Sequence, residues 1–127
     1  MGSKKVLVID DSNTIRRSAE IFLKQGGHEV MLAEDGFDAL AKVNDAEPDL
    51  IFCDILMPRL DGYQTCAIIK RNEKFAITPV VMLSSKDGLF DKARGRMVGS
   101  QDYLTKPFTK DQLLQAVQQF GIDNKGA

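Results

Sequence analysis

Two apolar runs end in aspartate: Val6-Leu7-Val8-Ile9-Asp10-Asp11 near the start of the chain and Leu50-Ile51-Phe52-Cys53-Asp54 in its middle. Short, continuously apolar runs are typical of strands buried on both faces of a parallel sheet. If these two strands are parallel neighbours, their carboxyl ends share one edge of the sheet and the aspartates converge there. At an effective dielectric constant near 20, two carboxylates about 4 Å apart repel each other by roughly 4 kcal/mol. We therefore expect a protonated carboxyl group or a bound cation at this edge, and favour the cation.

Further apolar runs alternate with amphipathic stretches along the chain. The expected strands are Val6–Asp10, Glu29–Ala33, Leu50–Asp54, Val80–Ser84 and Asp102–Thr105. Helical spacing of apolar residues predicts helices around Ile15–Leu23 and Leu113–Phe120, and three more are expected near Phe37–Asn44, Tyr63–Asn72 and Phe90–Val98. This alternation predicts an α/β fold, with a five-stranded parallel sheet in the flavodoxin-like order 2-1-3-4-5 and five helices on both faces.

Length and composition narrow the class of protein. The 127 residues suffice for one domain with a real core, and we expect it to span residues 5–121. Residues 1–4 are then an amino-terminal tail, native or left from expression, and residues 122–127 a carboxyl-terminal tail. A net charge of -1 gives no electrostatic reason to bind nucleic acid or an anionic membrane. No apolar run approaches the roughly 20 residues of a membrane span, so we expect a cytoplasmic protein. We also expect it to be a monomer.

The cysteines and the histidine carry little chemistry in the sequence. Cys53 lies in an expected core strand and Cys66 in an expected helix, and their spacing is not that of a metal site. We interpret both as reduced structural thiols. His28 follows two glycines and has no second histidine to help it bind a metal, so we expect a solvated loop residue.

Two more polar residues end strands at the edge where the aspartates converge. Ser84 follows the fourth apolar run and Lys106 follows the fifth. Oxygen ligands suit a hard cation, so Mg²⁺ is the expected occupant, with Mn²⁺ as the alternative. A hydroxyl and an ammonium group can hold the oxygens of an incoming phosphoryl group. Taken singly, each acid could be a helix cap and the lysine a surface residue; their joint position at one edge favours a site.

Four segments resemble the receiver domain of two-component response regulators, and the similarity runs from about Lys5 to Phe120. The segments are Val8-Ile9-Asp10-Asp11-Ser12, Asp54-Ile55-Leu56-Met57-Pro58-Arg59-Leu60-Asp61-Gly62, Met82-Leu83-Ser84-Ser85 and Lys106-Pro107-Phe108-Thr109. The resemblance implies the receiver fold and a module that assists its own phosphorylation but is not a turnover enzyme. A small phosphatase or phosphotransferase remains the enzymatic alternative, although no cap domain is evident.

The resemblance implies a role for each acid. Asp54 is the expected phosphoacceptor and, with Asp11, a direct ligand of the metal. Asp10 acts largely through bound water, and the backbone carbonyl of Leu56 completes the protein ligands. The family pattern thus makes Asp54 both a metal ligand and the nucleophile that forms an acyl phosphate.

The resemblance also implies a switch. Lys106, joined to Pro107 by a cis peptide bond in the family, pairs with the phosphoryl oxygens. Ser84 moves toward the phosphoryl group, and Tyr103 turns inward into the space that opens. The surface of the fourth helix, fifth strand and fifth helix then changes for an output protein. A static packed aromatic is the alternative for Tyr103.

Within the family, the stretches 57–66 and 84–92 are similar to single-domain regulators of type IV pilus twitching motility. That similarity implies the phosphohistidine of a chemotaxis-type histidine kinase as the phosphoryl donor and pilus extension as the output. A chemotaxis-type regulator of another motility output and a phosphorylation-independent scaffold remain as alternatives.

Overall fold

The computed structural model describes residues 2–85 and 91–122. Its strands are β1 (Lys5–Ile9), β2 (Glu29–Ala33), β3 (Leu50–Asp54), β4 (Val80–Ser85) and β5 (Asp102–Lys106). Its helices are α1 (Asn13–Gln25), α2 (Gly36–Ala46), α3 (Gly62–Arg71), α4 (Lys92–Val98) and α5 (Lys110–Phe120), with the short 3₁₀ helix η1 (Glu73–Phe75).

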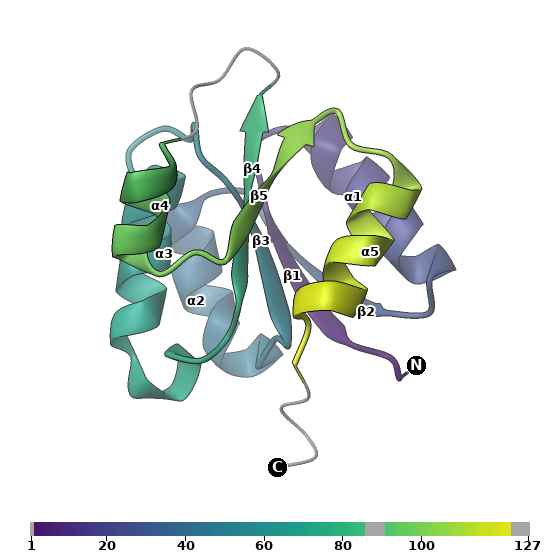
Figure 1. Ribbon diagram of the computed structural model, residues 1–127, viewed down its shortest axis with the longest axis horizontal. Helices are drawn as coiled ribbons and strands as arrows, with labels where there is room; N and C mark the ends of the chain where they lie inside the picture. The colour runs from purple at the N-terminus through teal and green to yellow at the C-terminus, as the bar shows by residue number, and fades with distance from the viewer. Residues whose placement is uncertain (1, 86–90, 123–127) are drawn as a thin grey trace.

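The strands form one parallel sheet in the order β2-β1-β3-β4-β5. Figure 1 shows α1 and α5 on one face of the sheet and α2, α3 and α4 on the other. The predicted fold class and strand order are therefore confirmed. Because all five strands run the same way, their carboxyl ends meet at a single edge, the upper one in Figure 1.

The apolar runs are buried on both faces because successive strand side chains point in opposite directions. In β1, Leu7 and Ile9 join the core under α2 and α3, while Val6 and Val8 join the core under α1 and α5. All five residues of β3 are buried, which explains why its sequence shows no polar alternation. The continuous apolar runs thus fix the central strands.

Each α-helix begins at a side chain that accepts a hydrogen bond from the backbone N–H three residues later, which satisfies one otherwise unpaired donor of the first turn. These N-caps are Ser12, Asp35, Asp61, Asp91 and Thr109. Asp61 with Gln64 and Thr109 with Gln112 form complete capping boxes. The caps therefore fix where the chain leaves the site edge and enters a helix.

Several sequence predictions need correction. The first strand ends at Ile9, so Asp10 follows it, and the 3₁₀ helix Glu73–Phe75 was not expected. His28 is not a freely solvated loop residue: its ring is half-buried, and Nδ1 accepts a hydrogen bond of 3.1 Å from the Lys4 backbone N–H. Phe90, the expected start of the fourth helix, lies outside the described residues. Within residues 2–85 and 91–122, we find no helix with the length and apolar character to cross a membrane.

Candidate functional site

The three aspartates do converge. Ile9 of β1 pairs with Cys53 of β3, so Asp10 and Asp54 lie side by side just past that pair. One carboxylate oxygen from each of Asp10, Asp11 and Asp54 falls within a cluster no wider than 4.8 Å. Asp10 is fully buried and Asp54 is 2% exposed, whereas Asp11 is exposed. We call these three residues the acidic cluster; two of its members are shielded from water and one is open to it.

Lys106 reaches the acidic cluster from β5, the edge strand that lies two strands from β3 in the sheet. Its Nζ lies 2.9 Å from Asp54 Oδ1 and 3.1 Å from Asp10 Oδ2, and its side chain is 16% exposed. The peptide bond between Lys106 and Pro107 is cis, as the resemblance implied. Lys106 ends β5 opposite Ser85 of β4, so strand pairing carries its ammonium group to the same edge as Asp54.

Burial sets the protonation of the cluster. Loss of water around Asp54, and then the charge of Asp10, raise the pKa of Asp54 to about 7, although Lys106 opposes the change. Burial likewise raises the pKa of Asp10. Burial would lower the pKa of Lys106, but the hydrogen bond to Asp54 and the charges of both carboxylates outweigh it and raise that pKa. One ammonium group therefore does not fully offset two buried carboxylates.

Asp10 is held by contacts that the sequence did not reveal. The Ser12 backbone N–H donates to Asp10 Oδ1 at 2.8 Å, and Arg16 Nη1 donates to the Asp10 backbone oxygen at 2.6 Å. Arg16 lies one turn into α1, whose N-cap is Ser12. The cap could have been expected from the sequence, but the arginine contact depends on how the helix leaves the strand.

Ser84 and Leu56 lie at the same edge without joining the Lys106 pairs. Tyr103 lies three residues before Lys106 in β5, opposite Met82 of β4. Among the contacts of the described residues, the Ser84 hydroxyl donates to the Ser85 carbonyl oxygen at 3.3 Å rather than to the acidic cluster. Tyr103 is half-buried and packs against the core beneath α3 and α4. Leu56 follows Asp54 by two residues, and its side chain is 69% exposed. The loop after β3 therefore presents an exposed apolar residue two positions after Asp54.

Two arginines connect that loop to neighbouring helices, and neither contact is predictable from local sequence patterns. Arg59 Nη2 lies 2.6 Å from Asp35 Oδ2, and its guanidinium group lies 5.1 Å from the centre of the Phe37 ring. Arg94 Nη2 lies 3.6 Å from Asp61 Oδ2. Asp35 and Asp61 are also the N-caps of α2 and α3, so each pairing holds a helix start as well as the loop.

Tyr63 extends the second of these contacts. Its hydroxyl accepts a hydrogen bond of 2.9 Å from the Asp91 backbone N–H, and the Arg94 guanidinium group lies 4.4 Å from the centre of its ring. Asp91 is the N-cap of α4. The starts of α3 and α4 are thereby tied together beside the site.

The donor set suits a hard divalent cation. Carboxylate oxygens, with backbone carbonyls and water, are the ligands that Mg²⁺ prefers, and Cys53, the nearest thiol, is buried with its pKa raised well above normal by burial. The repulsion between Asp10 and Asp54 gives a cation a further reason to bind. The residues present therefore fit a magnesium ion.

Comparison with known proteins agrees with this geometry. A model of the response regulator receiver domain family matches residues 6–118. Protein PilG of Pseudomonas aeruginosa is 68% identical over 114 residues, which cover 90% of this chain and 84% of PilG. The transcriptional regulatory protein PhoP of Bacillus subtilis is 39% identical over 107 residues, covering 84% of this chain and 44% of PhoP.

A solved structure gives the same result. The chemotaxis protein CheY4 of Vibrio cholerae superposes with a TM-score of 0.88 at 34% sequence identity, covering 94% of this chain and 99% of CheY4. Sequence family, relatives and fold agree over nearly the whole length. The chain belongs to the response regulator receiver domain family.

Proposed function

We propose that this protein is a single-domain response regulator whose Asp54 accepts a phosphoryl group from a histidine kinase. One observation carries the proposal: a carboxylate that is 2% exposed lies 2.9 Å from a lysine ammonium group and within an acidic cluster that fits a metal. An ordinary buried ion pair would need one carboxylate for one lysine. Here two buried carboxylates share one lysine, and the second carboxylate destabilises the fold. Such a destabilising arrangement is typical of functional sites, and it fits a carboxylate that must attack phosphorus.

Asp11 and Asp54 would hold Mg²⁺ directly, Asp10 through water, and Leu56 through its backbone carbonyl. When bound, the metal supplies positive charge that offsets the repulsion between an anionic phosphoryl group and the acidic cluster. Lys106 has a second task, because its ammonium group can move its hydrogen bonds from Asp54 to the phosphoryl oxygens. Mn²⁺ fits the same oxygen ligands.

The transfer itself is a displacement at phosphorus. A carboxylate oxygen of Asp54 forms the new bond, the phosphorus–nitrogen bond of the donor phosphohistidine breaks, and its electron pair stays on the imidazole. Asp54 becomes an acyl phosphate. Because Asp54 itself carries the phosphoryl group until hydrolysis releases it, the protein acts as a signalling partner rather than a turnover enzyme.

The signal then passes through Ser84 and Tyr103. The new phosphoryl oxygens can accept a hydrogen bond from Ser84, whose present acceptor, the Ser85 carbonyl, lies at a long 3.3 Å. Movement of Ser84 gives Tyr103 room to turn toward the core that it already touches. We propose that an output protein detects this change on the face formed by α4, β5 and α5.

The similarity to PilG supports a narrower assignment. We propose that the output is type IV pilus twitching motility, that the donor kinase is of the chemotaxis type, and that the protein works as a cytoplasmic monomer. Regulation of another motility output is the alternative that the same chemistry allows.

Phosphorylation is tested by incubating the protein with Mg²⁺ and acetyl phosphate and measuring intact mass. Wild type should gain one phosphoryl group, and Asp54→Asn should gain none because the nucleophile is lost. Asp45→Asn is the matched control, since Asp45 is an exposed carboxylate of α2 away from the cluster. Equal labelling of wild type and Asp54→Asn would refute Asp54 as the acceptor.

The motility assignment is tested in Pseudomonas aeruginosa cells that lack PilG. Expression of the wild-type chain should restore twitching, and expression of Asp54→Asn should not. Restoration by both proteins would favour the phosphorylation-independent scaffold. Failure of both, with normal phosphorylation in vitro, would leave the receiver chemistry intact and contradict the pilus output.

A further inference from the structure

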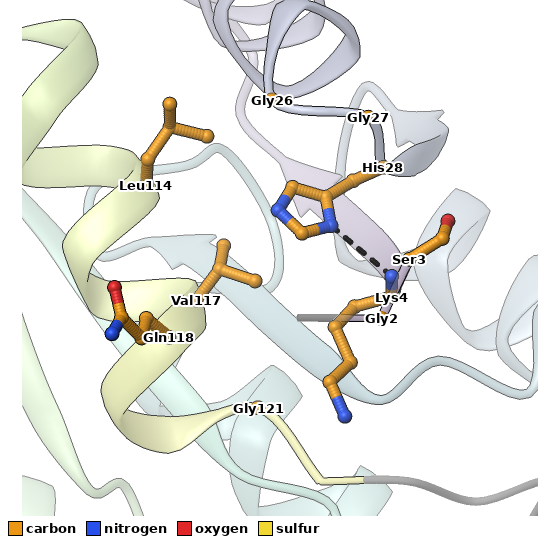
Figure 2. A pocket seen from close by; sticks show the side chains of 10 residues that line it. All are labelled: Gly2, Ser3, Lys4, Gly26, Gly27, His28, Leu114, Val117, Gln118 and Gly121. Atoms are coloured by element: carbon orange, nitrogen blue, oxygen red, sulfur yellow. Dashed lines mark hydrogen bonds between the residues drawn. The ribbon is translucent and has the colours of Figure 1, made fainter.

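A cavity formed by described residues lies far from the acidic cluster, at the opposite edge of the sheet. It has a volume of about 430 Å³, within the range of roughly 300–1,000 Å³ that small-molecule sites occupy. Its walls come from the chain just before β1, the turn between α1 and β2, and the last turns of α5 (Figure 2). The proposed phosphorylation chemistry makes no use of it.

His28 supplies a defined hydrogen-bond donor to this cavity. Its Nδ1 accepts the Lys4 backbone N–H at 3.1 Å, so the ring proton resides on Nε2. Figure 2 shows that second nitrogen directed toward the side of the cavity that carries Leu114 and Val117. Burial, and then the charge of Lys4, lower the pKa of His28, which keeps the ring neutral near pH 7. Within the described part of the chain, Nε2 has no hydrogen-bond partner of its own.

The cavity pairs an apolar wall with a positive rim. Leu114 and Val117 of α5 face the His28 ring across it, and Lys4 lies at its edge (Figure 2). Gly26 allows this close approach, because a Cβ there would lie 2.4 Å from Leu114 Cδ2. Among the described residues that line the cavity, none is an aspartate or glutamate, and Lys4 carries the positive charge. The lining therefore favours a ligand with an anionic acceptor and an apolar body.

We propose that this cavity binds a small organic anion of the aromatic carboxylate class. The carboxylate accepts a hydrogen bond from His28 Nε2–H. The Lys4 ammonium group, whose side chain extends toward Gly121 in Figure 2, supplies positive charge at the edge of the cavity. The ring of the ligand packs between the imidazole and the side chains of Leu114 and Val117. The site is distinct from the acidic cluster and does not depend on phosphorylation of Asp54.

The test uses phenylacetate as the probe and ¹⁵N-labelled full-length protein followed by two-dimensional NMR. Saturable shifts should appear at the amides of residues 26–28 and 117–121, with a dissociation constant of about 1 mM or below. Phenylacetamide, a neutral isostere, should bind at least about tenfold more weakly because it lacks the charge that Lys4 attracts. Shifts that do not saturate, shifts that map elsewhere, or equal binding of acid and amide would overturn the proposal.

Two pairs of variants distinguish the loss of ligand binding at this cavity from general effects of substitution on the protein. Gln118→Trp should fill the cavity and abolish binding, whereas Gln115→Trp, on the same helix but outside the lining, should leave the dissociation constant unchanged. Lys4→Met should weaken phenylacetate binding severalfold, and Lys110→Met should not. Acetyl phosphate labelling of Asp54 checks that every variant is folded. Unchanged binding by correctly labelled Gln118→Trp would refute the site.

Discussion

A few side chains at the carboxyl-terminal edge of the sheet carry the unfavourable burial of charge that the proposed function requires. Asp10 is fully buried and Asp54 nearly so, and each lies within 3.1 Å of the same lysine nitrogen. Replacing such a group removes its charge from a cluster in which every member responds to the others. Effects of single substitutions here should therefore not add.

We expect Leu56 to lengthen the lifetime of the phosphoryl group. It follows Asp54 by two residues, is exposed, and cannot hydrogen-bond a water molecule that attacks the acyl phosphate. Leu56→Asn should supply that hydrogen bond and speed the loss of phosphate by about tenfold, equivalent to roughly 1.4 kcal/mol of barrier. The decay of phosphorylated protein is followed by intact mass after removal of acetyl phosphate.

Leu56→Met serves as the control, because it keeps an apolar side chain and should decay at the wild-type rate. An unchanged decay rate in Leu56→Asn would contradict the role of this position. The resemblance to receiver domains marks both Leu56 and Lys86, two residues after Ser84, as departures from the polar residues that often assist hydrolysis in fast-cycling members. Lys86 lies outside the described residues.

The points at which helices and strands begin and end determine how the backbone of the site is held. The start of α3 is pressed against the end of β3: the Gly62 N–H donates to the Ile55 carbonyl oxygen at 2.8 Å. A Cβ on Gly62 would lie 2.2 Å from the Asp54 carbonyl oxygen. The close contact between these two elements fixes the backbone of Asp54, and glycine is required because no side chain fits.

Gly62→Ala should therefore destabilise the protein by at least about 2 kcal/mol, because backbone atoms of β3 must move. Gly36→Ala is the matched control at the start of α2, where a Cβ would meet side-chain atoms of Thr65 and Leu60 instead. These side-chain atoms must shift, and the buried Thr65 hydroxyl would lose its hydrogen bond to the Asp61 carbonyl oxygen, but no backbone atom of β3 has to move, so the loss of stability should be smaller. Urea unfolding measures both variants, and an equal loss of stability would contradict the assignment of Gly62 to backbone contact.

The molecule as a whole loses stability by burying these acids. The pKa of Asp54 rises from 3.8 to about 7 on folding, so the folded state binds more protons than the unfolded state between these values. Its contribution to stability is present in full at low pH and is lost as the pH rises through about 7. Without metal, the ionised cluster should thus destabilise the fold above neutral pH.

Asp54→Asn should consequently raise the unfolding free energy by more than about 1 kcal/mol near pH 8 in EDTA, and by much less near pH 4. Saturating Mg²⁺ should stabilise wild type and narrow the difference, because a ligand that binds only the folded state stabilises it. Thermal unfolding between these pH values measures the effect. A constant difference at all pH values would show that ionisation of Asp54 is not its cause.

Much of the fold follows from local patterns. The buried strands are recognisable because β1 and β3 are continuously apolar, and the helices because their apolar residues recur at 3.6-residue spacing. The acids that end these strands were therefore expected at one edge. The roles of Asp54, Ser84 and Tyr103 came instead from the resemblance to receiver domains, since spacing alone does not separate a phosphoacceptor from a metal ligand.

Local patterns set the edge at which the acids and the lysine gather, because the side-chain period and the turn residues depend only on near neighbours in the chain. Tertiary structure decided which groups touch. Lys106 meets Asp10 across 96 positions of sequence and Asp54 across 52. The arginine contacts, the fixed tautomer of His28 and the cavity beside it likewise join distant segments. Such contacts depend on strand register and helix placement, which arise only when the whole core packs.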